Sequence, residues 1–282
     1  MSDDATRHIW LCADDYGIAP GVNAAIRDLV ARGRLNAASS MVVAPNFTWD
    51  KARALVDLNA GRVRTAIGLH LTLTAPFAPL SPGYAPMKEG AFLSLPETLA
   101  RAMLRRLDPQ RLAAEVDAQF AAFRSAFGRL PDFVDGHQHV HLFPQIREAV
   151  VSAVKVHAPD AWVRQCGRPA GTPLRTRDLK GLLIDRLSGS FRHLAERRNL
   201  TTNTAFAGTY IFRDDVDFAT LFPRFLQGLG DGSLVMCHPG FVDAELARLD
   251  PVTTLREREY AYLASDAFPR DLQSAGVALK AP

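Results

Sequence analysis

The chain has 282 residues, of which 48% are hydrophobic and 22% are charged, and its formal net charge is +3. This balance is that of an ordinary globular protein, and the length fits one large α/β domain or two small ones. The small charge, with no basic stripe carrying interleaved aromatic residues, argues against a nucleic-acid partner. The sequence also lacks the apolar run of about 18 residues that a membrane span needs.

The N-terminus and the cysteines point to an ordinary intracellular chain. Residues 1–8 are acidic and polar where a signal peptide would be basic and then apolar, so we expect a cytoplasmic protein. Cys12, Cys166 and Cys237 lie far apart and form no CxxC pair, which predicts neither a disulfide framework nor a thiolate zinc site. Cys12 and Cys237 stand in apolar runs, so we expect them to be small core residues.

Short apolar runs alternate with helical patterns along the chain. Strands are expected at His8–Ala13, Ser39–Ala44, Thr65–Leu71, Asp132–Asp135, Ala161–Arg164 and Ser233–Cys237, with a weaker candidate at Ala205–Phe212. Helices are expected at Gly21–Arg32, Pro109–Phe127, Ile146–Val156, Asp178–Arg197, Ala219–Gly228 and Thr253–Ser265. Leu73–Pro96 is rich in Pro, Gly and Ala and predicts a long loop, a kind of segment that is usually functional or disordered.

The order of these elements predicts the fold class. Strands separated by helical patterns form parallel βαβ units with right-handed crossovers. Six or seven such units around one centre predict a distorted (β/α) barrel close to the (β/α)₈ type. Because no internal repeat or interdomain linker is visible, residues 1–282 are expected to form a single domain.

The most informative stretch is 135–141, which places three of the eight histidines at alternate positions. In an extended segment Asp135, His137, His139 and His141 would project from one side of the strand and form a polar row. Apolar residues flank the run on both sides, and buried imidazoles need partners. The simpler alternative is a solvated face or a run of ordinary surface histidines.

Ionisable residues also follow three other expected strands. Asp14 and Asp15 follow the first strand, His70 ends the third, and His238 follows a late one. Ligands of parallel α/β folds bind outside the carboxyl ends of the strands, so these groups should meet at one rim. Each has a simpler reading: a helix N-cap for the aspartates, a core position for His70, a turn for His238. However, two adjacent carboxylates repel each other unless a cation or a proton lies between them.

A carboxylate with imidazoles suits Zn²⁺, Co²⁺, Mn²⁺ or, with fewer imidazoles, Mg²⁺. An open coordination position activates water, while a further carboxylate and a histidine can serve as general base and acid. This inventory predicts metal-assisted hydrolysis of an acyl or similar group. Alternate strand positions are roughly 6.6 Å apart and metal–nitrogen bonds are about 2.1 Å, so the three histidines of the run cannot all bind one ion.

Four sequence blocks together resemble the YdjC-like (ChbG/HpnK) family of carbohydrate deacetylases. They occur in the family's order between residue 8 and about residue 243 and read Ala13-Asp14-Asp15-Tyr16-Gly17, Gly68-Leu69-His70-Leu71-Thr72, Asp135-Gly136-His137-Gln138-His139-Val140-His141 and His238-Pro239-Gly240-Phe241-Val242-Asp243. The resemblance implies a distorted (β/α) barrel related to polysaccharide deacetylases. It also implies removal of an N-acetyl group from an amino sugar, often a chitin-derived oligosaccharide.

The resemblance assigns roles to five residues of this chain. The family's metal ligands fall on Asp15, His70 and His137, its general base on Asp14, and the residue that protonates the leaving amine on His238. The family implies Mg²⁺ as the cofactor, although an Asp-His-His set is also a good Zn²⁺ or Co²⁺ site by ligand type.

The remaining expectations are less specific. We expect His139 and His141 to orient ligands or to contact sugar hydroxyls, and Arg164 to lie near the substrate or to orient Asp14. Rival functions are a metal-dependent glycosidase or amidohydrolase, and a non-catalytic sugar- or metal-binding barrel. The expected partner is an acetylated amino sugar; its length and phosphorylation, the chitobiose-type or hopanoid-associated branch, and a homodimer are left open.

Overall fold

A single parallel sheet forms the centre of the protein. The computed structural model describes residues 6–45, 47–60, 64–169, 171–172, 179–213 and 215–280. Within these residues the sheet has eight strands, in the order β5-β4-β3-β2-β1-β7-β6, with β8 beside β1. The strands are β1 Arg7–Tyr16, β2 Ala37–Ser40, β3 Ala66–Leu71, β4 Phe133–Gly136, β5 Trp162–Val163, β6 Phe206–Ala207, β7 Leu234–Cys237 and β8 Val277–Leu279.

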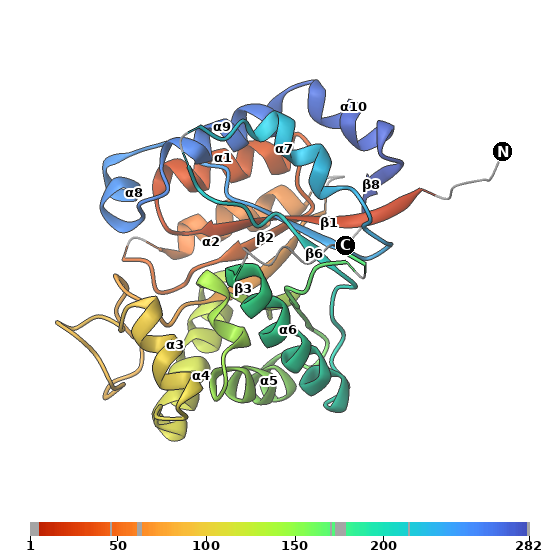
Figure 1. The fold of residues 1–282 in the computed structure, drawn as a ribbon. Coiled ribbons are helices and arrows are strands. Elements are labelled where there is room, and N and C mark those ends of the chain that lie inside the picture. Colours follow the sequence, from red (N-terminus) through yellow and green to blue (C-terminus); the bar gives the residue numbers. More distant parts are fainter. Residues whose placement is uncertain are drawn as a thin grey trace.

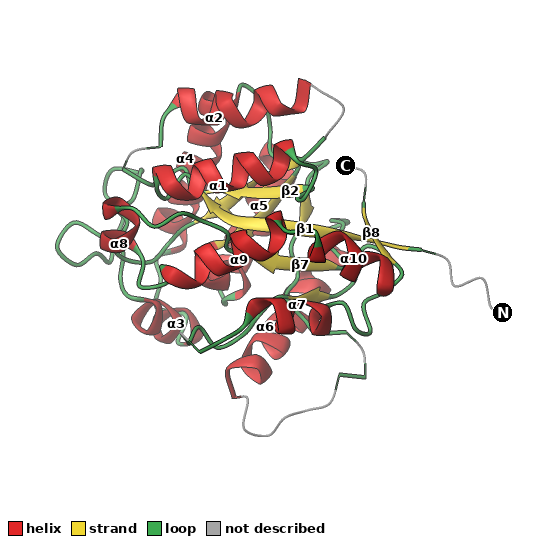
Figure 2. Cartoon of the chain, turned by 90° about the horizontal axis from the view of Figure 1, so that it is seen from above, coloured by secondary structure: helices red, strands yellow, loops and turns green. Residues whose placement is uncertain are grey.

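Helices surround the sheet (Figures 1 and 2). They are α1 Pro20–Ala31, α2 Trp49–Val56, α3 Leu95–Met103, α4 Pro109–Phe127, α5 Ile146–His157, α6 Leu179–Arg197, α7 Phe218–Phe225, α8 Ala244–Leu249, α9 Thr254–Ala264 and α10 Ala267–Ser274, with 3₁₀ turns η1 Asp57–Ala60 and η2 His137–Leu142. No helix in the described ranges has both the length and the apolar character that a bilayer crossing requires.

The two ends of the sheet approach each other through irregular contacts. Val163 in β5 forms a parallel bridge with Thr202, which lies shortly before β6. The backbone N–H of Phe206 in β6 donates to the carbonyl of Gly167 at 2.9 Å. These contacts replace a regular pairing of β5 with β6, and the expected distorted (β/α) barrel is confirmed.

The best-predicted element is α4, whose ends are set by local chemistry. The Asp108 carboxylate accepts hydrogen bonds from the backbone N–H groups of Gln110 and Arg111. Pro109 fits the first helical turn, and Gly128 ends the helix in the left-handed conformation that glycine adopts most easily. The apolar stripe faces the core through Leu112, Val116, Phe120, Phe123 and Phe127.

Several expected strands have different bounds. The first strand continues past Ala13 to Tyr16, so both aspartates belong to it. The expected strand Ser39–Ala44 is wrong in its bounds: pairing covers Ala37–Ser40, and the apolar residues 41–44 are buried in a turn. The weak candidate Ala205–Phe212 shrinks to two residues. For residues 41–44 the hydrophobicity reflects burial, which a core-facing turn shares with a strand.

Other elements were not expected from the sequence. These are α2, α3, α8, α10 and β8. The loop expected at Leu73–Pro96 ends early because Ser94 and Glu97 form a capping box that begins α3, with Pro96 in its first turn. For the helix expected at Asp178–Arg197, α6 begins at Leu179, and Asp178 lies outside the described residues.

The histidine run is not an extended strand, and the predicted row on one side is wrong. β4 ends at Gly136, and the chain turns through η2 with Gln138 and His139 at φ 53° and 60°. His141 is therefore carried into the core, where Nε2 donates to the carbonyl of Arg164 at 2.8 Å. A Cβ at Gly136 would lie 2.9 Å from Nδ1 of His141, so the turn needs a glycine there.

We expect Gly68→Ala to destabilise the sheet by about 1–3 kcal/mol because the space that the new methyl group needs is already filled. A Cβ at Gly68 would lie 2.3 Å from the ring of Phe133, which stacks on Trp162 with ring centroids 4.4 Å apart. Urea unfolding measures the change. The control is Gly189→Ala in α6, where no atom lies within 4 Å; it should stabilise by up to about 1 kcal/mol. Equal effects at the two positions would contradict the packing argument.

We also expect His141 to make the fold sensitive to acid. Burial lowers the pKa of His141 to about 4, against about 6.5 in an unfolded chain. The folded protein holds His141 in its neutral form, so the contribution of this residue to stability is fully present above pH 6.5. It is lost as the pH falls toward 4, at a cost of about 3 kcal/mol.

Urea unfolding of chelator-treated protein measures this contribution at pH 7.5, about one unit above the unfolded pKa, and at pH 4.5, about half a unit above the folded pKa. His141→Gln should be less stable at pH 7.5 and should lose less stability on acidification. His193→Gln, on the exposed side of α6, is the matched control. Parallel pH profiles for the wild type and His141→Gln would refute the assignment.

Candidate active site

A bulge in β1 brings two adjacent aspartates to the same cleft. Neighbouring residues of a regular strand point to opposite sides. The pairing of β1 with β2 shifts register between Ala13 and Tyr16, and Asp15 has φ 67°, in the left-handed region. As a result Asp14 and Asp15 both line one cleft, as bulges near functional sites often arrange. Neither caps α1, whose N-cap residue is Ala19.

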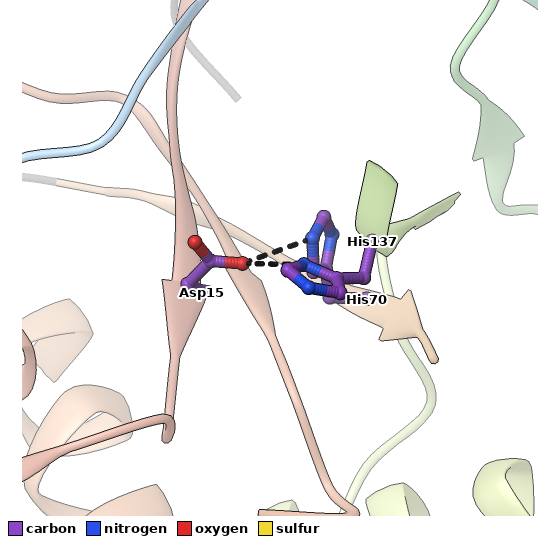
Figure 3. Close-up of side chains that lie close together, drawn as sticks. All are labelled: Asp15, His70 and His137. Carbon is purple, nitrogen blue, oxygen red and sulfur yellow. Dashed lines mark hydrogen bonds and ion pairs between the residues drawn. The ribbon is translucent and has the colours of Figure 1, made fainter. Parts of the chain in front are cut away.

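Asp15, His70 and His137 form a compact group of possible metal ligands (Figure 3). Oδ1 of Asp15 lies 3.3 Å from Nε2 of His70 and 3.1 Å from Nδ1 of His137. Two donors each about 2.1 Å from one ion, at tetrahedral or octahedral angles, are about 3.0–3.4 Å apart. The spacing of these three buried donors therefore fits a divalent cation.

A second carboxylate fixes the orientation of His70. Nδ1 of His70 donates to Oδ1 of Asp135 at 2.7 Å, and the Ser39 hydroxyl donates to the same oxygen. This bond makes Nε2 the nitrogen that faces Asp15 and that would bind an ion, as in the carboxylate–histidine–metal arrangements of many metal sites. Burial alone would lower the pKa of His70, but Asp135 and Asp14 outweigh it and raise the pKa to about 10.

Arg164, just after β5, joins two of the buried carboxylates. Its Nη1 and Nη2 donate to the two oxygens of Asp14 at 2.7 and 2.6 Å. Nη2 also lies 2.5 Å from Oδ2 of Asp135. The guanidinium is buried behind Asp14 and is not part of the cleft wall. Arg164 was expected either to lie near the substrate or to orient Asp14, and its hydrogen bonds favour the second role.

A second buried arginine holds Asp15. Nη2 of Arg256 in α9 donates to Oδ2 of Asp15 and to Oδ2 of Asp250, both at 2.6 Å. Burial alone would raise the pKa of Asp15, but Arg256 and His137 outweigh it and hold that pKa well below its ordinary value. Asp15 is therefore ionised, with one oxygen on Arg256 and the other toward the histidines.

The charges of this cluster favour a cation. Asp14, Asp15 and Asp135 are buried carboxylates, whereas two buried guanidinium groups, Arg164 and Arg256, face them. One negative charge remains uncompensated, and Asp250 beside Arg256 adds another. The raised pKa of His70 has the same cause, since a proton on its ring supplies positive charge where a metal ion would otherwise do so.

The cleft combines polar groups with apolar walls. Its volume is about 380 Å³, within the range of small-ligand sites. Carboxylates and imidazoles, among them Asp14, Asp15 and His70, line it. The walls come from α3, α6 and the segment before α9, and their apolar residues include Leu95, Leu99, Leu183, Ile184, Leu187, Leu249 and Val252.

The other predicted residues lie at different distances from the cleft. His238 is half-buried and lines it, and its Nδ1 has no hydrogen-bond partner among the described residues. His139 also lines the cleft, with its ring edge-on to Phe206. His141 lies in the core behind the site and reaches it only through the backbone of Arg164. The loop after β3 contributes Phe77, which packs edge-on against His137.

Sequence reasoning missed Ser39, Asp250 and Arg256 as site residues. Arg256 falls on the buried stripe of α9 with Leu255 and Leu263, but this stripe does not show which group the guanidinium contacts. A weak signal existed for Glu259, which falls on the buried stripe of α9 between Leu255 and Tyr262. Its carboxylate accepts a hydrogen bond from the backbone N–H of His238 at 2.5 Å.

Known proteins resemble this chain in sequence and in fold. The chitooligosaccharide deacetylase of Yersinia pestis (strain Pestoides F) is 28% identical over 242 residues, covering 83% of this chain and 82% of that protein. A proposed cellobiose-phosphate cleavage protein of Enterococcus faecalis V583 superposes with a TM-score of 0.76 at 19% identity, covering 98% and 97% of the two chains. The Bc1960 peptidoglycan N-acetylglucosamine deacetylase superposes with a TM-score of 0.51 at 10% identity, covering 98% and 86%.

At these identities the two structural likenesses show the fold, and they agree with the barrel found here. The sequence gives a family assignment as well. The model of the family described as YdjC-like protein matches residues 8–274, which include all four blocks that carried the resemblance. The chain therefore belongs to the YdjC-like family.

Proposed function

We propose that this protein is a metal-dependent carbohydrate N-deacetylase that hydrolyses the acetamide of an amino sugar. The observation that carries the proposal is the shared cleft: the Asp15–His70–His137 group, Asp14 and His238 all line it. The name of the Yersinia pestis relative, a chitooligosaccharide deacetylase, supports an acetylated chito-oligosaccharide as substrate.

Asp15, His70 and His137 would hold the divalent cation. When bound, the cation supplies Lewis acidity that polarises the acetyl carbonyl and lowers the pKa of water. Two imidazoles and one carboxylate suit Zn²⁺ or Co²⁺ by ligand type, and family resemblance points to Mg²⁺. The hydrogen bond from Nδ1 of His70 to Asp135 leaves Nε2 as the nitrogen that would bind the cation.

Asp14 is the proposed general base. Each of its oxygens accepts one hydrogen bond from Arg164. Oδ1 also accepts a weak one from the Cys12 thiol at 3.6 Å, and Oδ2 keeps a second lone pair. The guanidinium therefore fixes the plane of the carboxylate without using all of its acceptor capacity. Asp14 can then accept the proton of the attacking water while its orientation is held from behind.

His238 is the proposed general acid toward the departing nitrogen. It lies at the end of β7, next to β1 in the sheet, so its ring lines the cleft beside the strand that carries Asp14. The ring is edge-on to Phe212, with centroids 5.6 Å apart, and its backbone is held by Glu259. A base and an acid on separate strands leave room for the scissile amide between them.

The glycosidase alternative has less support from the geometry. A glycosidase needs one carboxylic acid that stays protonated and a second carboxylate across the bond. Among the described residues the carboxylates of the cleft are Asp14, Asp15 and Asp250, and each is paired with an arginine. No described carboxyl group of the cleft is thus left without a guanidinium partner to serve as the acid.

We expect the purified protein to release acetate from N-acetylated chito-oligosaccharides only when a divalent cation is present. Chelation should abolish release because the donor group of Asp15, His70 and His137 would stand empty. Readdition of Mg²⁺, Co²⁺ or Zn²⁺, one at a time, should restore it. Reducing-sugar release is measured in the same samples. Reducing sugar without acetate would favour a glycosidase, and sugar binding with neither product would favour a binding protein.

Asp14→Asn should lower kcat by at least about 100-fold because an amide cannot accept the proton of water. The donor atoms of the metal group are untouched, so the metal content of the purified variant should match that of the wild type. Acetate assays and elemental analysis of the same preparation measure both. Asp117→Asn, an exposed carboxylate on α4, is the control. Wild-type turnover in Asp14→Asn would remove Asp14 from the catalytic role.

A further inference from the structure

Arg256 is almost fully buried at the mouth of the barrel, with 1% of its surface exposed. Nε donates to the carbonyl of Val252 at 3.0 Å. Nη2 donates to Asp15 and to Asp250, each at 2.6 Å. These three acceptors hold the guanidinium through Nε and Nη2, whereas Nη1 has no hydrogen-bond partner among the described residues. A buried cation placed this way must be compensated by the groups it touches.

Because of the contact with Arg256, the two oxygens of Asp15 have different partners. Oδ2 is taken by Arg256, and Oδ1 faces His70 and His137. Free carboxylates rotate and can offer a cation either oxygen or both. With Oδ2 held by a charged donor, Asp15 can offer a cation one oxygen in one orientation.

The helix that carries Arg256 is itself tied to the end of β7. The backbone carbonyl of Arg256 accepts a hydrogen bond from the N–H of Gly240 at 3.1 Å. One turn later Glu259 accepts from the N–H of His238 at 2.5 Å and from the hydroxyl of Tyr210 at 2.5 Å. α9 thus fixes the segment of His238 and, through Arg256, the side chain of Asp15.

We propose that Arg256 is a positioning residue for the cation site: it selects Oδ1 of Asp15 as the coordinating oxygen, and Asp250 holds the guanidinium in place. The inference rests on the proposed function only in that a divalent cation binds at Asp15, His70 and His137. Groups that orient metal ligands in this way typically change metal affinity about 10–100-fold when removed.

The test is a titration of metal-free protein with Co²⁺, followed by the visible absorption of the bound ion. Arg256→Gln should weaken Co²⁺ binding by about 10–100-fold and alter the absorption bands, because Oδ2 of Asp15 becomes free to join or replace Oδ1. The matched control is Arg258→Gln, two residues along α9 and exposed to solvent, which should match the wild type in both readouts.

Arg256→Lys separates position from charge and also covers the case in which Arg256→Gln does not fold. Lysine keeps a cation but has one ammonium group, which cannot reproduce the planar guanidinium that bridges the two aspartates and Val252. We expect Co²⁺ affinity between those of the wild type and Arg256→Gln. Circular dichroism and thermal unfolding show whether each variant is folded.

Wild-type affinity with an unchanged spectrum in folded Arg256→Gln overturns the inference, and so does the same result for Arg256→Lys if the glutamine variant does not fold. A wild-type protein that does not bind Co²⁺ overturns it as well. Because every readout is metal binding, absence of acetate release from all sugars would count against the proposed function and would leave this result standing.

Discussion

Burial of three carboxylates at one end of the barrel is the constraint that organises this structure. Taking an ion out of water costs several kcal/mol unless a partner and further hydrogen bonds compensate it. Asp14, Asp15 and Asp135 come from two strands, and Arg164 and Arg256 compensate them from the end of β5 and from α9. The requirement for compensation therefore ties elements together that are far apart in the sequence, and it does so at the mouth of the sheet.

The irregular backbone around the site serves the same requirement. A regular β1 would point one of its two aspartates away from the cleft, and the bulge at Asp15 turns it back. His137 follows the extended Gly136 directly and lies beside Asp15. The turn at Gln138 and His139 then sends His141 into the core against Arg164. Left-handed residues are unfavourable in isolation and persist where surrounding contacts fix them.

The sequence was sufficient for what depends on periodicity and on motifs. The stripe of Pro109–Phe127 predicts α4, and the alternation of strands and helices predicts the parallel barrel. The four blocks indicate the residues that the structure brings to one cleft. The sequence was insufficient where tertiary contacts determine the backbone conformation. The histidine run has a strand-like alternation, yet the packing of Gly136 against His141 requires a turn. Arg256 lies on the buried stripe of α9, and only the position of Asp15 makes it part of the site.

The retention of these charges is itself an argument about function. Well-packed apolar residues in place of a buried ion-pair network often leave a protein equally or more stable. Here the network keeps more negative than positive charge, and apolar residues of α3 and α6 line the cleft beside it. In such surroundings charges interact more strongly than in water. A fold under selection for stability alone would not keep an excess of carboxylates in this environment, whereas a site that must attract a divalent cation and hold a base beside it needs that excess.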